Sequence, residues 1–282
     1  MIIDGHTHIF PPTVRRDRET LCHRERGFSS IYGDPKAKIE GVDALVASMG
    51  EAGVAMSVIC GFPWEQRDLC RLHNDYLLES ASRFPDRLIA FVTLPVRDPG
   101  WSCSELERAL QAGARGVGEV AFYEEEMTRD DMERMKPLLD LMIGRNVPLL
   151  LHTNETVGHA YPGKGRTEIA RFYELALASP GLPLLLAHWG GGLPFYEMMP
   201  EVAASLSSVY YDTAASPYLY SKGVYSIVSA MVGPEKIVFG SDFPLLSPLR
   251  YFQDVKESGL SQEDQEKILG LNLARLLDLE RR

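Results

Sequence analysis

Eight short apolar segments recur along the chain, and each is followed by a longer stretch with helical periodicity. The segments are nearly continuous in apolar character, which is typical of strands buried on both faces of a parallel sheet. They are Ile2–His6, Met56–Cys60, Leu88–Val92, Gly116–Val120, Pro148–His152, Leu184–His188, Val209–Asp212 and Ile237–Gly240. Eight strand–helix units in 282 residues predict an α/β fold that closes as a (β/α)8 barrel.

The helical stretches support one TIM-barrel domain over residues 1–282. The expected helices are Val42–Ala52, Asn74–Arg83, Ser104–Gln111, Asp131–Arg145, Glu168–Ser179, Pro194–Ser205, Ser221–Val232, Leu249–Lys256 and Gln262–Leu277. An open doubly wound sheet is the alternative, but no G-x-G-x-x-G sequence follows the first strand, which disfavours it. No linker or low-complexity segment divides the chain.

A long loop, Ile9 to Glu40, separates the first strand from the first helix and carries five arginines. Loops of this length in compact domains are usually lids or binding loops, although a solvated surface excursion is the simpler alternative.

Charge and composition exclude several classes of partner. The formal net charge is −10, so a nucleic-acid ligand is not expected. No apolar run approaches the roughly 18 residues that span a membrane, and the N-terminus has no signal-peptide pattern. The expected partner is a small-molecule substrate, the expected location is the cytoplasm, and a homodimer is the default oligomer.

Residues that bind metals recur where the predicted strands end. His6 and His8 are two positions apart on the first strand, so both side chains point to the same side. The other candidates end or follow later strands, and they are Glu119, His152, His188 and Asp242. The carboxyl ends of parallel barrel strands lie on one rim, so we expect these six residues to meet around a divalent cation.

The motifs Asp4-Gly5-His6-Thr7-His8 and Gly240-Ser241-Asp242-Phe243-Pro244, together with His152 and His188, resemble the amidohydrolase superfamily. The resemblance is to its amidohydrolase-related (amidohydrolase 2) group of metal-dependent TIM-barrel hydrolases and decarboxylases. It implies that the first pair, His152 and Asp242 ligate metal, and that His188 binds a second metal or contacts water or substrate. The strand-four lysine found in many members is absent, and Glu119 looks like the glutamate of TatD-like hydrolases.

The residues favour a hydrolase that directs a metal-activated water at an amide, ester or lactone of a small, carboxylated substrate. Asp242 would accept and return the water's proton, and His188 would orient the water or steady the oxyanion. Zinc is the preferred ion, as one or two ions, with Mn²⁺ or Fe²⁺ as alternatives. A metal-dependent decarboxylase of a carboxylated ring, a metal-free lactonase and a non-catalytic metal-holding barrel are the other hypotheses.

Substrate-binding candidates come from two loops. The loop after the fifth strand supplies Asn154, His159, Tyr161 and Lys164, and the loop after the second strand supplies Trp64. Lys164 suits a substrate carboxylate. Two further histidines, His23 and His73, are expected at the surface or in the lid.

Overall fold

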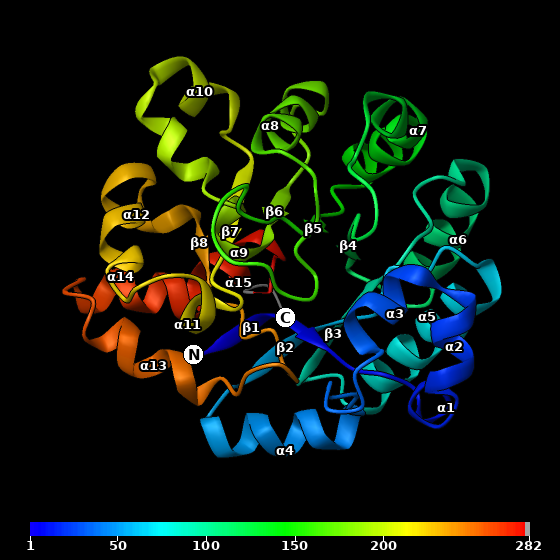
Figure 1. Ribbon diagram of the computed structural model, residues 1–282. Helices are drawn as coiled ribbons and strands as arrows, with labels where there is room; N and C mark the ends of the chain where they lie inside the picture. Colours follow the sequence, from blue (N-terminus) through cyan, green and yellow to red (C-terminus); the bar gives the residue numbers. More distant parts are fainter. Residues whose placement is uncertain (280–282) are drawn as a thin grey trace.

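The computed structural model describes residues 1–279 and shows eight parallel strands in sequential order around a barrel (Figure 1). The strands are β1 (Ile3–His8), β2 (Met56–Cys60), β3 (Leu88–Val92), β4 (Gly116–Val120), β5 (Leu149–Leu151), β6 (Leu184–Leu186), β7 (Val209–Asp212) and β8 (Ile237–Val238). The predicted TIM-barrel fold is therefore confirmed. The predicted domain, 1–282, includes residues 280–282, which lie outside the described part.

The barrel closes through irregular hydrogen bonds, because β8 ends two residues earlier than predicted. Gly5 N donates to Phe239 O over 2.7 Å, and Asp242 N donates to His6 O over 2.9 Å. A side chain at Gly5 would lie 2.9 Å from a methyl group of Val238, so glycine is needed for this close approach. The segment after β8 thus lies against β1 and carries Asp242 to the barrel mouth.

A ring of helices surrounds the strands in Figure 1. The helices and helical turns from residue 42 onward are α4 (Val42–Ala52), α5 (Arg67–Arg83), α6 (Pro99–Gln111), α7 (Arg129–Arg145), α8 (Ile169–Ala178), α9 (Ala187–Gly190), η1 (Leu193–Met198), α10 (Pro200–Ser205), α11 (Ser216–Leu219), α12 (Val224–Val232), η2 (Pro234–Lys236), α13 (Leu249–Lys256), α14 (Gln262–Glu266), η3 (Lys267–Leu271) and α15 (Asn272–Leu276). Of these, α9 is a short turn that lies at the barrel mouth, inside the ring. Two predicted helices are interrupted. Pro200 begins a new helix after η1, and a π-helical turn at η3 divides the C-terminal helix.

The segment predicted as a long loop after β1 is mostly helical. It contains α1 (Pro12–Arg16), α2 (Arg18–Arg24) and α3 (Arg26–Tyr32). Phe28 on α3 is fully buried and stacks on Trp64, with ring centroids 5.0 Å apart. This aromatic packing explains why the segment folds as a cap over the β2 end of the barrel and is not a solvated excursion.

Among residues 1–279, no helix is both long enough and apolar enough to span a bilayer.

Candidate metal centre

Six side chains meet at the barrel mouth, as the strand-end pattern predicts. They are His6 and His8 from β1, Glu119 from β4, His152 directly after β5, His188 two residues after β6, and Asp242 after β8. The Nε2 atoms of His6 and His8 lie 3.0 Å apart. Glu119 Oε1 lies 3.6 Å from His6 Nε2 and 3.1 Å from His152 Nδ1, so this carboxylate stands between the two histidine pairs. Asp242 Oδ1 is 3.6 Å from His8 Nε2.

Each of the four imidazoles has one ring nitrogen against an acceptor outside the cluster, which fixes the position of its proton. His6 faces the Asp212 carboxylate, and His8 faces the carbonyl of Gly61. His152 faces the carbonyl of Gly163, and His188 faces the carbonyl of Ala214. When the rings are neutral, the second nitrogen of each ring therefore presents a lone pair to the centre. There it faces other lone pairs and the carboxylates of Glu119 and Asp242, with separations from 3.0 Å to 3.9 Å.

Converging acceptors without hydrogens between them repel one another in a buried pocket. A divalent cation relieves that repulsion, and imidazole and carboxylate are ligands that such ions accept. Two sets of three donors are close enough to hold an ion, His6/His8/Glu119 and Glu119/His152/His188. The donor set therefore fits a divalent metal, with Glu119 common to both sets.

The electrostatics of the centre also favour a bound positive charge. Burial lowers the pKa of His6, but the carboxylates of Asp212 and Glu119 outweigh it and raise the pKa to about 10. In the metal-free centre His6 therefore carries a second proton, which a cation binding to its inward nitrogen displaces. Burial raises the pKa of Glu119, but the attraction of His152 and His6 lowers it by a larger amount, so the net shift of this pKa is downward. The pKa of His8 is lowered by burial and by the neighbouring His6. The pocket thus retains ionised carboxylates and attracts cations.

Asp212 at the end of β7 is a site residue that the sequence analysis missed. Its side chain is fully buried, and Oδ2 accepts from His6 Nδ1 over 2.7 Å. Oδ1 accepts from the backbone N–H groups of His188, 2.8 Å away, and Ala214, 2.9 Å away. One carboxylate therefore orients the candidate ligand His6 on β1 and the backbone of the candidate ligand His188 after β6. Its position at a strand end, like that of the other candidate ligands, was the available signal.

Two of the candidate ligands have a backbone conformation that residues other than glycine rarely adopt. His188 has φ 55° and Asp242 has φ 61°, both in the left-handed region. After His188 the chain continues with positive φ through Gly191, where an added Cβ would lie 2.3 Å from Asn154 O. The tight turn after β6 therefore depends on glycine, and it packs directly on the loop after β5.

Of the five predicted substrate-binding residues, Trp64 and Asn154 are buried. Trp64 Nε1 donates to His73 Nδ1 over 2.9 Å, and His73 Nε2 donates to Ile9 O over 2.7 Å. The prediction that His73 lies at the surface or in the lid is wrong, because this histidine of α5 is fully buried and connects the loop after β2 to Ile9, the residue after β1. Asn154 Nδ2 donates to Glu155 O over 3.3 Å.

The other three candidates lie in the loop after β5, which crosses the barrel mouth in Figure 1. Lys164 Nζ donates to the carbonyls of Val157 and His159, at 2.7 Å and 3.1 Å. Tyr161 donates its hydroxyl to Glu155 over 2.8 Å. The structure therefore brings the six metal-ligand candidates together but does not gather the five substrate candidates on one wall.

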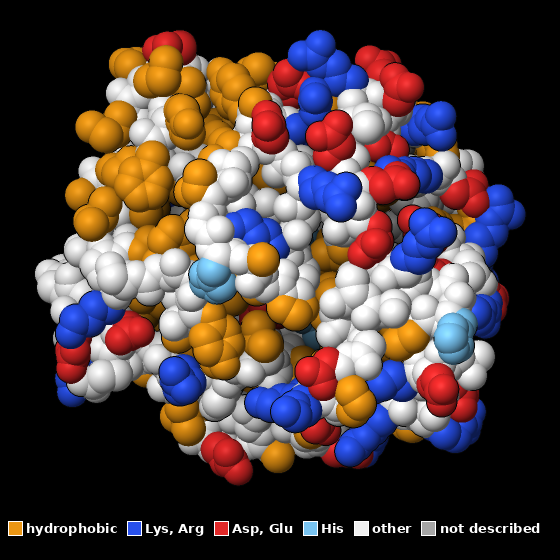
Figure 2. Space-filling view, in the orientation of Figure 1, with side chains coloured by type: hydrophobic (Ala, Val, Ile, Leu, Met, Phe, Trp, Pro, Cys, Tyr) orange, Lys and Arg blue, Asp and Glu red, His pale blue; other side chains and the backbone are white. Residues whose placement is uncertain are grey.

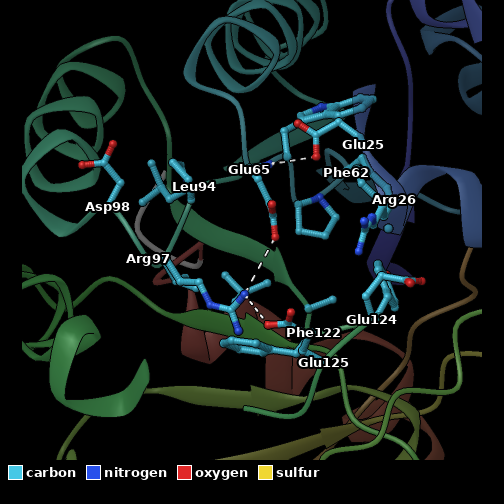
Figure 3. A pocket seen from close by; sticks show the side chains of 18 of the residues that line it. Glu25, Arg26, Phe62, Glu65, Leu94, Arg97, Asp98, Phe122, Glu124 and Glu125 are labelled. Atoms are coloured by element: carbon cyan, nitrogen blue, oxygen red, sulfur yellow. Dashed lines mark hydrogen bonds and ion pairs between the residues drawn. The ribbon is translucent and has the colours of Figure 1, made fainter. Parts of the chain in front are cut away.

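A cavity of about 570 Å³ opens beside the metal centre, between the cap and the loops after β3 and β4 (Figure 3). Arg97 reaches across it and pairs with Glu125 over 2.9 Å. The six candidate ligands all belong to the described chain, and none lines this cavity. Tyr123 separates the two spaces, because its hydroxyl donates to Glu119 over 3.1 Å and its ring stacks on Phe62 at 5.8 Å.

Curated relatives of the chain and several similar solved structures are decarboxylases. A gamma-resorcylate decarboxylase from Polaromonas is 24% identical over 253 residues, which cover 76% of this chain and 77% of the relative. Among solved structures, a 5-carboxyvanillate decarboxylase from Novosphingobium aromaticivorans, complexed with manganese, has a TM-score of 0.81 at 14% identity and covers 99% of this chain and 96% of its own. A dihydroxybenzoic acid decarboxylase from Polaromonas, with bound manganese and the inhibitor 2-nitroresorcinol, has a TM-score of 0.76 at 18% identity. The match covers 100% of this chain and 98% of that decarboxylase.

These relatives overturn the prediction of a hydrolase acting on an amide, ester or lactone. The physical reason is that the same imidazole and carboxylate ligands can hold a cation for hydrolysis or for decarboxylation, so the ligands do not distinguish these two reactions. The interpretation of Glu119 as favouring a hydrolase with a metal-activated water is wrong. The chain is an enzyme with a divalent-metal site, as predicted, and the relatives' manganese does not single out zinc. Because the amidohydrolase family model matches residues 3–279, the chain belongs to the amidohydrolase family.

Proposed function

We propose that this enzyme is a metal-dependent decarboxylase that removes CO2 from a carboxylated aromatic acid. The observation that carries the proposal is the convergence of four imidazole lone pairs and two carboxylates at one buried point of the barrel mouth. The similarity to decarboxylases of resorcylate and carboxyvanillate supports this reaction.

The residues proposed to hold the ion are His6, His8 and Asp242, with Glu119 beside them and His152 and His188 on its other side. Mn²⁺ or Zn²⁺ suits these nitrogen and oxygen donors. Because Glu119 belongs to both donor sets, the centre suits one ion or two ions that share this carboxylate. When bound, the cation supplies Lewis-acid chemistry, polarising a substrate oxygen beside the carboxylate that leaves.

Aromatic side chains surround the approach to the centre. Tyr32 of the cap lies edge-on to Phe10, with centroids 5.1 Å apart, and edge-on to Phe62 at 6.0 Å. Burial, together with the carboxylates of Asp242 and Glu119, raises the pKa of the Tyr32 phenol. Its hydroxyl therefore keeps its proton and can donate a hydrogen bond to an anionic substrate, while the neighbouring rings pack against an aromatic one.

Decarboxylation replaces the carboxylate carbon with a proton on the same ring carbon. The electron pair of the broken C–C bond stays on the ring and is taken up by the incoming proton, so the balanced products are the arene and CO2. We assign proton delivery to Asp242, whose side chain is 16% exposed, whereas that of Glu119 is 2% exposed and closed off behind Tyr123. His188, held by Asp212 and Ala214, is assigned to orient the substrate oxygen.

The test is CO2 release by the Mn²⁺-loaded enzyme from 2,6-dihydroxybenzoate labelled with ¹³C at its carboxyl group and from 5-carboxyvanillate labelled with ¹³C at its 5-carboxyl group. We expect labelled CO2 and one equivalent of decarboxylated arene. Treatment with a chelator should abolish turnover and Mn²⁺ should restore it. Asp242→Asn should lower the rate at least about 100-fold, which is the usual effect of removing a general acid.

Loss of substrate without CO2 release would contradict the proposal, as would an unchanged rate in the chelator-treated enzyme. The negative control is a ring of the same size without the carboxylate, 2-nitroresorcinol, which should inhibit and not react.

A further inference from the structure

One candidate metal ligand, His152, is oriented by a loop and not by the barrel. Its Nε2 donates to the carbonyl of Gly163, which lies 2.8 Å away and 11 residues further along the chain. The outer acceptors of the other three histidines are Asp212 at the end of β7, Gly61 directly after β2 and Ala214 two residues after β7. The barrel strands fix those three acceptors, whereas the position of the Gly163 carbonyl depends on how the loop after β5 lies.

We call residues 155–164 of this loop the strap. It crosses the barrel mouth in Figure 1, and in the space-filling view of the same orientation its atoms cover that part of the mouth (Figure 2). All of its residues belong to the described chain, none of them is buried, and residues 156–160 are exposed in succession. A segment with so few buried contacts opens at a lower free energy than the strands beneath it.

Bonds between its own residues give the strap its shape. Lys164 Nζ donates to the carbonyls of Val157 and His159 and lies 5.5 Å from the centre of the Tyr161 ring. The Tyr161 hydroxyl donates to Glu155 over 2.8 Å. Because these bonds are internal, the strap can move away from the barrel mouth as one unit without breaking them.

In the closed position, Gly163 lies between the cap and the loop after β4. A Cβ built on Gly163 would be 3.8 Å from Ile31 of α3 and 3.9 Å from Tyr123, which are ordinary contact distances. The glycine has φ +92°, a backbone conformation that other residues rarely adopt. The direction of its carbonyl, toward His152, therefore depends on both the glycine and these neighbours.

We propose that closure of the strap positions His152 for metal binding, and that a bound cation in turn holds the strap closed. A histidine must be neutral to ligate a metal, and the bond to Gly163 then fixes its proton on Nε2. Its Nδ1 lone pair is left facing Glu119, 3.1 Å away, and His188, 3.2 Å away. When the strap opens, the ring loses its outer acceptor and the proton can occupy either nitrogen.

Gly163 is thus a positioning residue that acts through His152. The inference rests on the assignment of His152 as a metal ligand, which is part of the proposed function, but not on the reaction that the metal serves. A cation on Nδ1 makes the Nε2–H group a stronger donor to the Gly163 carbonyl. By linkage, the factor by which closure raises metal affinity equals the factor by which metal favours closure, and an outer hydrogen bond of this kind is typically worth 10- to 100-fold.

The first test is the Mn²⁺ affinity of Gly163→Ala, measured by calorimetric titration of the metal-free protein. Alanine is strained at φ +92° and displaces the carbonyl, so the dissociation constant should rise at least about 10-fold. Gly181→Ala is the matched control. Gly181 has φ +84°, lies between α8 and β6, and has nothing within 4 Å of its added Cβ. This control should show a similar loss of stability in urea and the wild-type Mn²⁺ affinity.

A second variant changes the strap without touching the glycine. Lys164→Met removes two internal hydrogen bonds, so the strap keeps its closed shape less often and Mn²⁺ should bind about 5-fold more weakly or worse. Lys136→Met on α7 is its control, because that ammonium group also makes two hydrogen bonds, both to Asp140. It should leave the Mn²⁺ affinity unchanged.

The reciprocal effect is measured by limited proteolysis with elastase, which cleaves after small apolar residues such as Val157, 77% exposed on the strap. Saturating Mn²⁺ should slow cleavage after Val157 at least about 10-fold in the wild type and in Gly181→Ala, but much less in Gly163→Ala.

Wild-type Mn²⁺ affinity in Gly163→Ala would overturn the inference, as would an equal loss of affinity in Gly163→Ala and Gly181→Ala. Cleavage after Val157 at one rate with and without Mn²⁺ would also overturn it. Each of these results leaves the proposed decarboxylase standing, whereas a wild-type protein that binds no Mn²⁺ would overturn the inference and the proposed function together.

Discussion

Asp212→Asn should weaken metal binding while leaving the fold nearly intact. Asp212 accepts from His6 Nδ1 and from the N–H groups of His188 and Ala214. An asparagine keeps one carbonyl oxygen, which can still accept from the two backbone groups. Its NH2 group then faces His6 Nδ1, which must become an acceptor. The His6 proton moves to Nε2, the atom that faces the centre, and this nitrogen loses its free lone pair.

The expected magnitude follows from this change of tautomer and from the lost negative charge. Removing the partner that orients a ligating histidine typically lowers metal affinity 10- to 100-fold. That corresponds to about 1.4 to 2.8 kcal/mol of binding free energy. The free energy of unfolding of the metal-free protein should fall by only about 1 kcal/mol, because the bond to His6 reverses its direction and loses only its charge-assisted strength.

Calorimetric titration of Mn²⁺ into the metal-free protein measures the metal affinity, and urea unfolding measures the free energy of unfolding. Glu105→Gln is the matched control. Glu105 is equally buried and pairs with Arg108 over 2.7 Å and Arg71 over 2.6 Å, on helices outside the metal centre. It should lose about 3 kcal/mol of stability and keep the wild-type Mn²⁺ affinity. An Asp212→Asn protein that binds Mn²⁺ as tightly as the wild type would refute the assigned tautomer.

Two further predictions concern stability. Burial lowers the pKa of His73 from 6.5 to about 4, so protonation of this histidine favours the unfolded state. The free energy of unfolding is therefore highest above pH 6.5 and falls by up to about 3 kcal/mol as the pH drops to 4. Urea unfolding at pH 7 and 4.5 checks this, and an equal drop in His73→Gln would assign the pH dependence to other groups. Gly191→Ala should cost at least about 2 kcal/mol, because its Cβ would meet Asn154 O at φ +60°. Gly50→Ala in α4 meets nothing within 4 Å and should stabilise by about 0.5–1 kcal/mol; equal thermal shifts in the two variants would contradict the strain at Gly191.

The barrel and the six candidate ligands were predictable because both depend on local patterns. A strand buried on both faces needs a continuous apolar run, and Leu184–Leu186 is such a run whose neighbours in the barrel could be inferred from chain order. Once the strands are parallel, the residue after each run reaches the same rim. His152 and His188 could therefore be placed together although 36 residues separate them.

Features that depend on tertiary contacts were not predictable in the same way. The helices of the cap are only five to seven residues long, and Phe28 is buried by Phe62 and Trp64, which lie more than 30 residues away in the chain. Lys164 has the charge to bind a carboxylate, but only the folded loop shows that its ammonium group donates to two carbonyls of that loop. The reaction itself was mispredicted because the same ligands serve hydrolysis and decarboxylation.

The central claim is that residues from opposite ends of the chain converge on one catalytic cation. Anomalous diffraction at the manganese absorption edge, from crystals of the Mn²⁺-loaded enzyme, tests it most directly. The account predicts an anomalous peak within coordination distance, about 2.0–2.4 Å, of His6, His8 and Asp242, on the inward lone pairs of the cluster. A fully loaded crystal with no peak there, or with its peak at another site, would contradict it.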